Sequence, residues 1–254
     1  MMLKAIDIHC HFNHGGKFDT DETEDYICNL EFLRKEHTRL NVPVCAMAGT
    51  FSAVISYQTV EQENEYLYKL SQEDPFVYQW VVIDPRNENT FKQAEVILKS
   101  DKCLGIKIIS EYHKYPLKDY ANKIFSFAND RGAIVLSHPA FDYRMEDIDK
   151  YSDMKLILAH LGTGQGYYVP IMQNAKHQNV YADTSGSASS KNNVIEYTVQ
   201  QVGSEKILFG TDSYSCAFQR GRIDYADISE KDKKNILYKN ALKLFPKLKE
   251  TFHI

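Results

Sequence analysis

Residues 6–12 read IDIHCHF and place a carboxylate and two imidazoles at alternate positions. Because successive side chains of a strand point to opposite faces, Asp7, His9 and His11 are expected to share one face, and the other face would be apolar. Two histidines two residues apart, beside a carboxylate, are typical of half of a metal site. From this stretch alone, two buried structural histidines remain the alternative.

Four later apolar runs also end in an ionisable side chain. These residues are Lys107 in GIKII, His138 in IVLSHPA, His160 in LILAHLG and Asp212 in ILFGTDS. Alternation predicts that Leu158 shares the face of His160 and that Ile157 faces the helices. Buried charges without partners cost several kcal/mol, so the lysine and aspartate are hard to explain by packing alone. A shared metal centre accounts for all of these groups together.

Eight apolar runs rich in β-branched and aromatic residues must position these groups, and helical segments separate the runs. They cover residues 4–12, 42–50, 76–85, 103–110, 133–140, 154–162, 179–187 and 206–214. Strand followed by helix, eight times over, predicts parallel strands with crossover helices. In 254 residues this predicts an α/β fold, a (β/α)8 TIM barrel that forms a single domain over residues 1–254. A doubly wound sheet is the alternative, but no glycine-rich phosphate loop follows the first run.

The C-terminal strand ends of such a barrel meet at one mouth, where the ionisable groups are expected to converge. The connection after the first run, FNHGGKFDTDETEDY, is long and acidic. With His14, Gly15 and Gly16, it is a candidate lid. Asp7 is expected beside His9, either supporting the metal ligands or paired with a lysine below them.

Composition limits the partners of the protein. The net charge is −4 and no Lys/Arg run occurs, which argues against a nucleic-acid surface or an anionic membrane surface. The start, MMLKAIDIHC, shows no signal peptide, and no apolar stretch reaches membrane-spanning length. A small-molecule substrate and a cytoplasmic location are therefore expected, while a homo-oligomer stays open.

The cysteines also favour a cytoplasmic location. Five cysteines occur without CxxC spacing: Cys10, Cys28, Cys45, Cys103 and Cys216. They are expected to be free, mostly buried thiols in a reducing compartment.

The set of motifs, in this order, resembles the amidohydrolase superfamily, and within it the amidohydrolase-related (amidohydrolase 2) branch of metal-dependent TIM barrels. The resemblance spans nearly the whole chain: HxH in the first strand, histidines that end the fifth and sixth, and GTDS in the eighth. It implies one divalent metal, usually zinc, bound by His9, His11, His138 and Asp212. It also implies that His160 orients or polarises the metal-bound water or the substrate.

Lys107 departs from the decarboxylases of that branch, which have no lysine there. Elsewhere in the superfamily a carboxylated lysine bridges two metals, and in that case His138 and His160 would hold a second ion. One metal is favoured, with Lys107 as an ammonium that pairs with Asp212 or a substrate carboxylate. TatD-like metal nucleases also have HxH, but they use a glutamate at strand four, and the acidic net charge disfavours DNA.

The resemblance implies a metal-dependent hydrolase of a small amide, ester or lactone, because a carboxylated strand-four lysine, at the place of Lys107, belongs to hydrolytic members of the superfamily. Zinc would lower the pKa of a bound water to roughly 7. Asp212 would shuttle its proton, His160 would stabilise the oxyanion, and Lys107 would take part in catalysis or substrate binding. The alternative is a metal-dependent lyase that decarboxylates or hydrates an unsaturated or aromatic carboxylic acid. A barrel that keeps the metal only for structure is a third reading.

Specificity is expected to lie in the loops. Arg220 and Arg222 in the last loop suit a substrate carboxylate, although solvated surface arginines are the commoner case. His113 and Tyr115, after the fourth strand, offer polar and stacking contacts. Trp80 is expected in the core. The other histidines are expected at the surface or terminus: His37, His177 and His253.

Overall fold

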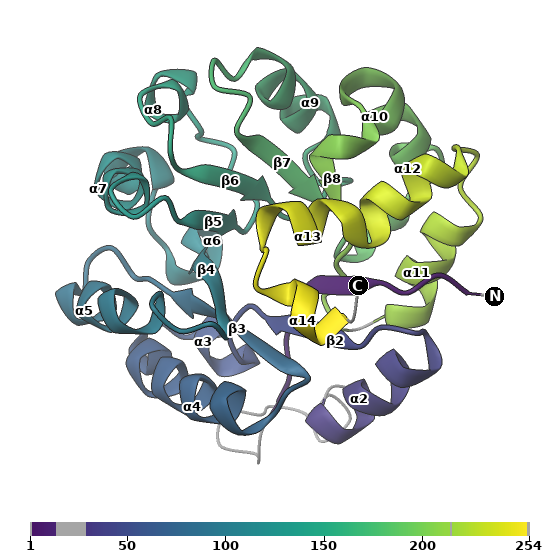
Figure 1. Ribbon diagram of the computed structural model, residues 1–254. Coiled ribbons are helices and arrows are strands. Elements are labelled where there is room, and N and C mark those ends of the chain that lie inside the picture. The colour runs from purple at the N-terminus through teal and green to yellow at the C-terminus, as the bar shows by residue number, and fades with distance from the viewer. Residues whose placement is uncertain (1, 14–28, 214, 253–254) are drawn as a thin grey trace.

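Eight parallel strands lie side by side in sequence order in the computed structural model, which describes residues 2–13, 29–213 and 215–252 (Figure 1). The strands are β1 (Ile6–Cys10), β2 (Val44–Met47), β3 (Val77–Val82), β4 (Cys103–Ile108), β5 (Ile134–Ser137), β6 (Lys155–Leu158), β7 (Val180–Asp183) and β8 (Ile207–Leu208). Each strand lies within one of the eight predicted runs. The prediction of a single-domain TIM barrel is therefore confirmed.

The two ends of the sheet meet. The Ile8 N–H donates to the Phe209 carbonyl at 3.0 Å, and the Thr211 N–H donates to the His9 carbonyl at 3.1 Å. These bonds bring the end of β8 against β1 and make the sheet a nearly closed barrel. The residues that follow β8 are thereby placed beside the two histidines of β1.

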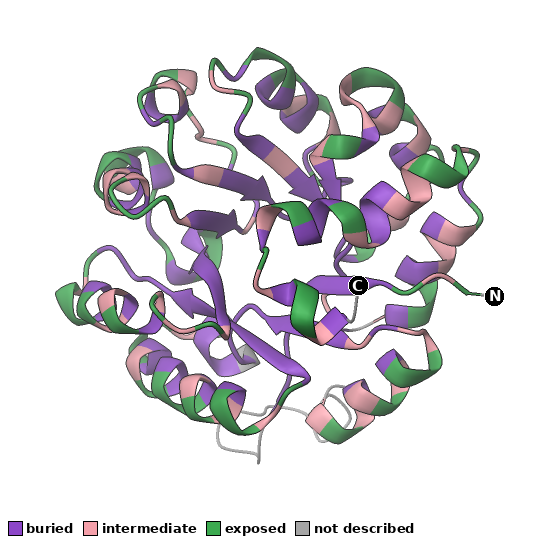
Figure 2. Ribbon diagram, in the orientation of Figure 1, coloured by how far each residue is buried: buried purple, intermediate pink, exposed green. Residues whose placement is uncertain are grey.

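Helices form the outer layer and carry most of the exposed residues, whereas the strands are almost entirely buried (Figure 2). The helices are α2 (Leu30–Arg39), α3 (Phe51–Ile55), α4 (Val60–Glu73), α5 (Glu88–Ile97), α6 (Ser110–His113), α7 (Leu117–Asn129), α8 (Met145–Asp149), α9 (Gln165–Asn174), α10 (Val194–Val202), α11 (Cys216–Asp224), α12 (Glu230–Lys234), α13 (Asn240–Leu244) and α14 (Leu248–Phe252). Shorter turns are η1 (Tyr57–Thr59), η2 (Ser187–Ser190), η3 (Ser204–Lys206) and the π-helical η4 (Asn235–Lys239). No helix in these described ranges is long and apolar enough to cross a bilayer.

Sequence patterns explain these helices locally. In α7 the buried side chains recur at helical spacing, which gives the helix one apolar face toward the sheet. They are Leu117, Ala121, Ile124, Phe125 and Ala128. At the start of α2, the Asn29 side chain accepts a hydrogen bond from the Phe32 N–H at 2.8 Å and caps the first turn.

The inside of the barrel is filled by apolar side chains, and its N-terminal end is closed by α13 and α14, which face the viewer in Figure 1. Trp80 is fully buried there, packs edge-on against Phe245, and donates its indole N–H to the Ile8 carbonyl at 2.8 Å. The prediction that Trp80 belongs to the core is confirmed. The opposite end of the barrel is left for the polar groups.

A register shift in β1 changes which side chains share a face. Asp7 pairs with Cys45 of β2, but Cys10 pairs with Met47, so one residue of β1 is unmatched between them. Ile6 and Ile8 therefore point into the barrel, whereas Cys10 and Phe12 pack under the outer layer. The prediction that these four side chains form a single apolar face of the strand is wrong. A bulge of this kind leaves no mark in an alternating sequence pattern.

The same bulge turns Asp7 away from His9 and toward α2. Its carboxylate lies 2.8 Å from Nε2 of His37, and both side chains are fully buried. The predictions of Asp7 beside the metal ligands and of His37 at the surface are therefore both wrong. The His37 side chain reaches inward from the buried face of α2.

Cys10 and Cys45 come close enough through the pairing of β1 and β2 to be joined by a disulfide. For these two residues the prediction of free thiols is wrong. Cys103 and Cys216 are buried thiols, as predicted. Cys28, His253 and the candidate lid with His14, Gly15 and Gly16 lie outside the described residues.

Candidate metal centre

Three metal-ligating side chains converge at the C-terminal mouth of the barrel. His9 and His11 come from the end of β1, and Asp212 follows β8. The Asp212 Oδ1 lies 3.3 Å from the His11 Nε2 and 3.9 Å from the His9 Nε2. The three donor atoms lie within 4.8 Å of one another. Both imidazoles are buried, while the Asp212 side chain is 23% exposed toward the mouth.

Hydrogen bonds on the far side of each ring prepare both histidines as ligands. The His9 Nδ1 lies 2.7 Å from the Asp183 Oδ2, and the His11 Nδ1 lies 3.1 Å from the Gly49 carbonyl oxygen. Because these oxygens accept, each Nδ1 carries the proton and each Nε2 keeps its lone pair. The lone pairs therefore face the Asp212 carboxylate, as metal coordination requires.

Asp183 and Ser185 belong to this site, and both are absent from the sequence-based prediction. Asp183 ends β7 and is fully buried; its Oδ1 accepts from the Ser185 hydroxyl and, at 3.1 Å, from the His160 N–H. The Ser185 hydroxyl also lies 2.9 Å from the His160 Nδ1. The signal was present in VYADTS, where an ionisable residue ends a strand, as in the other runs.

His160 reaches the mouth because the chain changes conformation after β6. Its φ of +60° is left-handed, so the alternation of the strand does not continue to this residue. Ile157 accordingly points into the barrel and Leu158 packs in the outer layer, so the predicted faces of these two residues are wrong. The His160 ring still stacks on His9, with 5.1 Å between ring centroids.

A glycine makes room for this ring. A Cβ at Gly186, which has φ +75°, would lie only 2.5 Å from the His160 Nδ1. Both the backbone conformation and the close approach therefore require glycine at this position.

His138 completes the histidine group from the end of β5. Its ring lies edge-on to His160 at 5.2 Å and edge-on to Tyr112 at 5.1 Å. Burial, and to a smaller extent the charge of Lys107, lowers the pKa of His138 to about 2. The imidazole is therefore neutral and able to act as a ligand at any pH near neutrality.

Lys107 lies within the cluster. It is fully buried in β4, and its Nζ is 2.9 Å from the His9 Nε2. Burial lowers the pKa of Lys107 to about 8, although the carboxylates of Asp183 and Asp212 act in the opposite direction. This amine donates to the lone pair that a metal would use, so metal binding at His9 requires that Lys107 give up this contact.

Asp212 sits on an unusual backbone. Asp212 and Ser213 have φ values of +60° and +71°, and this left-handed conformation is costly for residues other than glycine. A hydrogen bond from the Asp212 N–H to the His9 carbonyl, at 2.8 Å, helps to stabilise it. Burial alone would raise the pKa of Asp212, but the hydrogen bond to His11 and the charges of the histidines outweigh burial and lower the pKa well below its ordinary value. The side chain is thus kept as a carboxylate.

The four candidate substrate-binding residues have other partners. Arg220 is 1% exposed and binds Asp224 and, at 2.8 Å, the carbonyl of Leu3 at the N-terminal end of β1, the end opposite the mouth. Arg222 pairs with Glu196 at 3.3 Å.

His113 and Tyr115, the two candidates after β4, also have other partners. His113 donates to the Ala53 carbonyl at 2.7 Å, and Tyr115 lies under the guanidinium of Arg86. Both side chains are thus held by other partners, and their contact with substrate stays a prediction.

The donor set fits a divalent ion, because imidazole nitrogens and a carboxylate with an open side toward solvent are the ligands of catalytic metal sites. A TIM barrel with this set at its C-terminal mouth defines the class of metal-dependent barrel enzymes. The chain belongs to the amidohydrolase family, whose family model matches residues 6–247. The resemblance noted in the sequence is thus confirmed, and the chain is an enzyme of this family.

Several proteins that this chain resembles are decarboxylases. Gamma-resorcylate decarboxylase from Polaromonas sp. strain JS666 is 28% identical over a stretch that covers 38% of this chain and 36% of that protein, about a third of its length. The 2,6-dihydroxybenzoate decarboxylase from Rhizobium superimposes with a TM-score of 0.76 at 15% identity, covering 96% of this chain and 99% of that chain.

A dihydroxybenzoic acid decarboxylase from Polaromonas sp. JS666, with bound manganese and the inhibitor 2-nitroresorcinol, superimposes with a TM-score of 0.71 at 17% identity over the whole of both chains. At these identities the structural similarity establishes the fold. The activities of the relatives overturn the predicted hydrolase, however, and favour the alternative lyase class. The expectation of zinc is likewise not supported by a neighbour that carries manganese.

Proposed function

We propose that this protein is a metal-dependent, non-oxidative decarboxylase of a hydroxylated aromatic carboxylic acid. The observation that carries the proposal is the convergence of His9, His11 and Asp212 at the mouth of a barrel shared with dihydroxybenzoate decarboxylases. His138 and His160 surround the same point. The activity of the relatives supplies the reaction class, and the donor set supplies the chemistry that this class needs.

One divalent ion would be held by His9, His11, His138 and Asp212. These four side chains offer nitrogen and oxygen donors, which suit manganese as well as zinc. The manganese-bound neighbour favours manganese. When bound, the ion would act as a Lewis acid that neutralises negative charge on substrate oxygens.

The protein residues must then handle one proton. Decarboxylation converts a carboxylate and a proton into carbon dioxide and a new C–H bond, so the ring carbon has to be protonated as the C–C bond breaks. Asp212 is a carboxylate with its open side toward the mouth, and it can take a proton from a substrate hydroxyl and deliver it to that carbon. His160, held at Nδ1 by Ser185, would present its Nε2 to the substrate.

Exposed aromatic side chains near the mouth suit an aromatic ring. Tyr112 is 45% exposed and contacts His138, and Phe141, from the loop after β5, is 64% exposed and packs beside Tyr167. Such rings provide offset or edge-to-face contacts with a benzoate. They favour an aromatic acid over an aliphatic one.

The test is a direct assay. Manganese-loaded protein is offered 2,6-dihydroxybenzoate and related hydroxybenzoates, with unsubstituted benzoate as the matched control. Carbon dioxide and the corresponding phenol are expected from hydroxylated acids and not from benzoate, because only the former carry a hydroxyl that can exchange a proton with Asp212. Folded, metal-loaded protein that releases no carbon dioxide from any hydroxybenzoate would contradict the proposal.

A further inference from the structure

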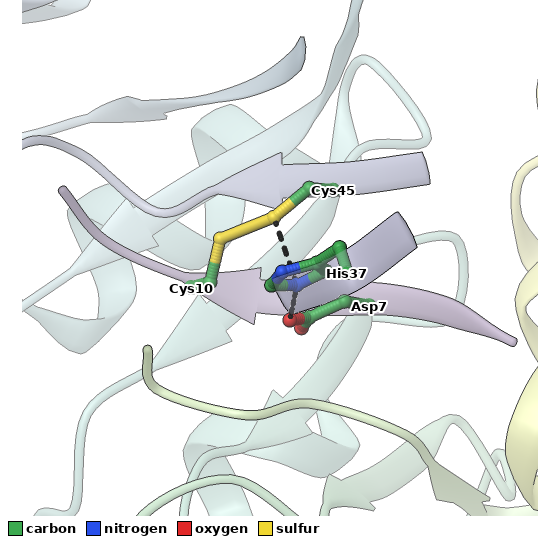
Figure 3. Close-up of side chains that lie close together, drawn as sticks. All are labelled: Asp7, Cys10, His37 and Cys45. Atoms are coloured by element: carbon green, nitrogen blue, oxygen red, sulfur yellow. Dashed lines mark hydrogen bonds and ion pairs between the residues drawn. A yellow bond between two sulfur atoms is a disulfide. The ribbon is translucent and has the colours of Figure 1, made fainter. Parts of the chain in front are cut away.

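A second group of metal-ligating side chains lies outside the barrel, between β1, β2 and α2 (Figure 3). Asp7 and Cys10 come from β1, His37 from α2 and Cys45 from β2. One donor atom from each lies within 4.8 Å of all the others, and all four residues are completely buried. Because of the bulge in β1, this group faces α2 while the neighbouring histidines of the same strand face the mouth.

The His37 ring is arranged like that of a metal ligand. Its Nδ1 lies 2.8 Å from the Leu33 carbonyl oxygen, which can only accept, so this nitrogen carries a proton. Its Nε2 lies 2.8 Å from the Asp7 Oδ2, which also accepts. Two acceptor atoms at this distance need either a hydrogen or a metal ion between them. A ring held by Nδ1–H on a carbonyl is the usual outer support of a metal-bound histidine.

Asp7 is fixed in the same manner. Its Oδ1 accepts from the backbone N–H groups of His9 and Thr211 at 3.0 and 3.2 Å. Its Oδ2 accepts from the Thr211 hydroxyl at 2.6 Å. These donors orient the carboxylate so that Oδ2 faces His37 and the sulfurs.

The cysteines supply the remaining two donors. Cys45 Sγ lies 3.5 Å from the His37 Nε2, and in the structure it is bonded to Cys10, so the pair is in its oxidised state. Leu33, Phe76 and Val77 pack around the group and enclose it in apolar surroundings. Two thiolates, one imidazole and one carboxylate, enclosed without an open position, form the donor set of a structural tetrahedral site.

We propose that the reduced protein binds a zinc ion, or another thiophilic divalent ion, through Asp7, Cys10, His37 and Cys45, and that the disulfide is the metal-free alternative of this site. The site is separate from the centre at the mouth, whose proposed ligands His9, His11, His138 and Asp212 include no sulfur. Its ion would tie α2 to both β1 and β2.

The chemistry of the exchange balances. On reduction by a phosphine, each sulfur gains one electron and one proton, and the phosphine becomes its oxide with oxygen taken from water. On metal binding, the two thiols release their protons to solvent and the ion takes the thiolates. Oxidation by a peroxide reverses the sequence: two electrons leave the thiolates, the S–S bond forms, the metal departs, and the peroxide becomes two waters.

Cobalt(II) distinguishes the two sites, because only thiolate ligands give an intense sulfur-to-cobalt charge-transfer band in the near ultraviolet. Protein reduced with a phosphine and freed of reductant without air is titrated with cobalt. The band is expected to grow to one equivalent per chain, to be absent in unreduced protein, and to remain in Asp212→Asn. Reduced wild-type protein that binds cobalt without this band would overturn the proposal.

Single substitutions then assign the ligands. Cys10→Ser, Cys45→Ser and His37→Gln are expected to lose or weaken the band, while the matched controls Cys103→Ser and Cys216→Ser keep it. Circular dichroism of each variant checks that it is folded. If a ligand variant does not fold, peptide mapping replaces it: cobalt should protect Cys10 and Cys45 of the wild-type protein from alkylation. Equal alkylation with and without cobalt contradicts the site.

Discussion

The Asp183 carboxylate lies 2.7 Å from Nδ1 of His9, on the side of the imidazole opposite Asp212. A residue that ends β7 thus sets the tautomer of His9, a proposed metal ligand on β1. Asp183 also accepts from the backbone N–H of His160, so one buried carboxylate orients two of the histidines. The geometry of the mouth therefore depends on a side chain that does not itself face the metal.

Asp183→Asn is expected to lower metal affinity by about 10–100-fold, because the amide no longer enforces a proton on the His9 Nδ1. Metal titration followed by fluorescence of a competing chelator measures this change. The exposed Asp227 offers the control Asp227→Asn, which should bind metal like the wild-type protein. Unchanged affinity in Asp183→Asn would show that His9 keeps its tautomer without the carboxylate.

Asp212→Asn is expected to lower kcat by about 100–10,000-fold, the range for loss of a proton-transfer group. The change keeps the size of the side chain and one oxygen donor, so metal affinity should fall much less than in His9→Ala. Steady-state kinetics and metal analysis of both variants test this separation. Turnover close to wild type in Asp212→Asn would remove the residue from the proposed mechanism.

Lys107→Ala is expected to leave one metal equivalent bound and to reduce activity. The amine lies beside the His9 nitrogen that a metal would use, so we expect Lys107 to act as an ammonium and not as a bridging ligand. Metal content of the wild type and the variant is measured with and without added bicarbonate. Two equivalents in the wild type, with bicarbonate-dependent loading that the variant loses, would instead indicate a carboxylated lysine.

Gly186→Ala is expected to displace the His160 ring and to lower activity at least tenfold, because the new Cβ would lie 2.5 Å from Nδ1. Gly132→Ala is the matched control. That position also has a positive φ, +56°, but nothing lies within 4 Å of the added Cβ. Both variants should lose about 1–2 kcal/mol of stability from backbone strain. Equal activity in the two variants would show that the contact with His160 does not matter.

Asp84 makes stability depend on pH. Burial alone would raise the pKa of Asp84, but its hydrogen bonds and ion pair with Arg86, at 2.7 Å, outweigh burial and lower the pKa. A carboxyl with a folded-state pKa below its unfolded value of about 3.9 stabilises the fold above that pH, and this contribution is lost as the pH falls through the folded-state pKa.

Arg86→Gln is expected to lower the free energy of unfolding at neutral pH by about 1–3 kcal/mol, because the buried Asp84 carboxylate loses its two guanidinium donors and keeps only the backbone N–H of residue 86. Urea denaturation across the acid range measures the effect. The difference between variant and wild type should shrink below about pH 4, where Asp84 is protonated in the unfolded state. A difference that does not change with pH would assign the effect to packing of Arg86 against Tyr57.

Most of the barrel could be predicted from the sequence because fully buried parallel strands appear as short apolar runs, and each strand lies within such a run. The positions of His9, His11, His138 and Asp212 followed from the rule that barrel strands end at the mouth. Asp183 obeys the same rule in VYADTS. It could have been found by applying that rule to every strand.

Other features depend on backbone geometry that the sequence does not show. The bulge in β1 turns the Asp7 carboxylate away from the His9 ring and toward the His37 ring. The left-handed φ of His160 interrupts the alternation of β6. The prediction that Leu158 shares the face of His160 is therefore wrong, although His160 itself reaches the site. Arg220 looked like a loop residue, but α11 turns it toward Leu3 at the other end of the barrel.

The packing of Trp80 has a practical consequence for spectroscopy. It is the one tryptophan of the chain, and its indole lies inside the barrel against Phe245, near the end closed by α13 and α14. Its intrinsic emission should therefore change when the barrel opens and should be little affected by ligands at the mouth. Fluorescence can follow unfolding of this enzyme in the presence of substrate or metal, without a signal from binding to correct for.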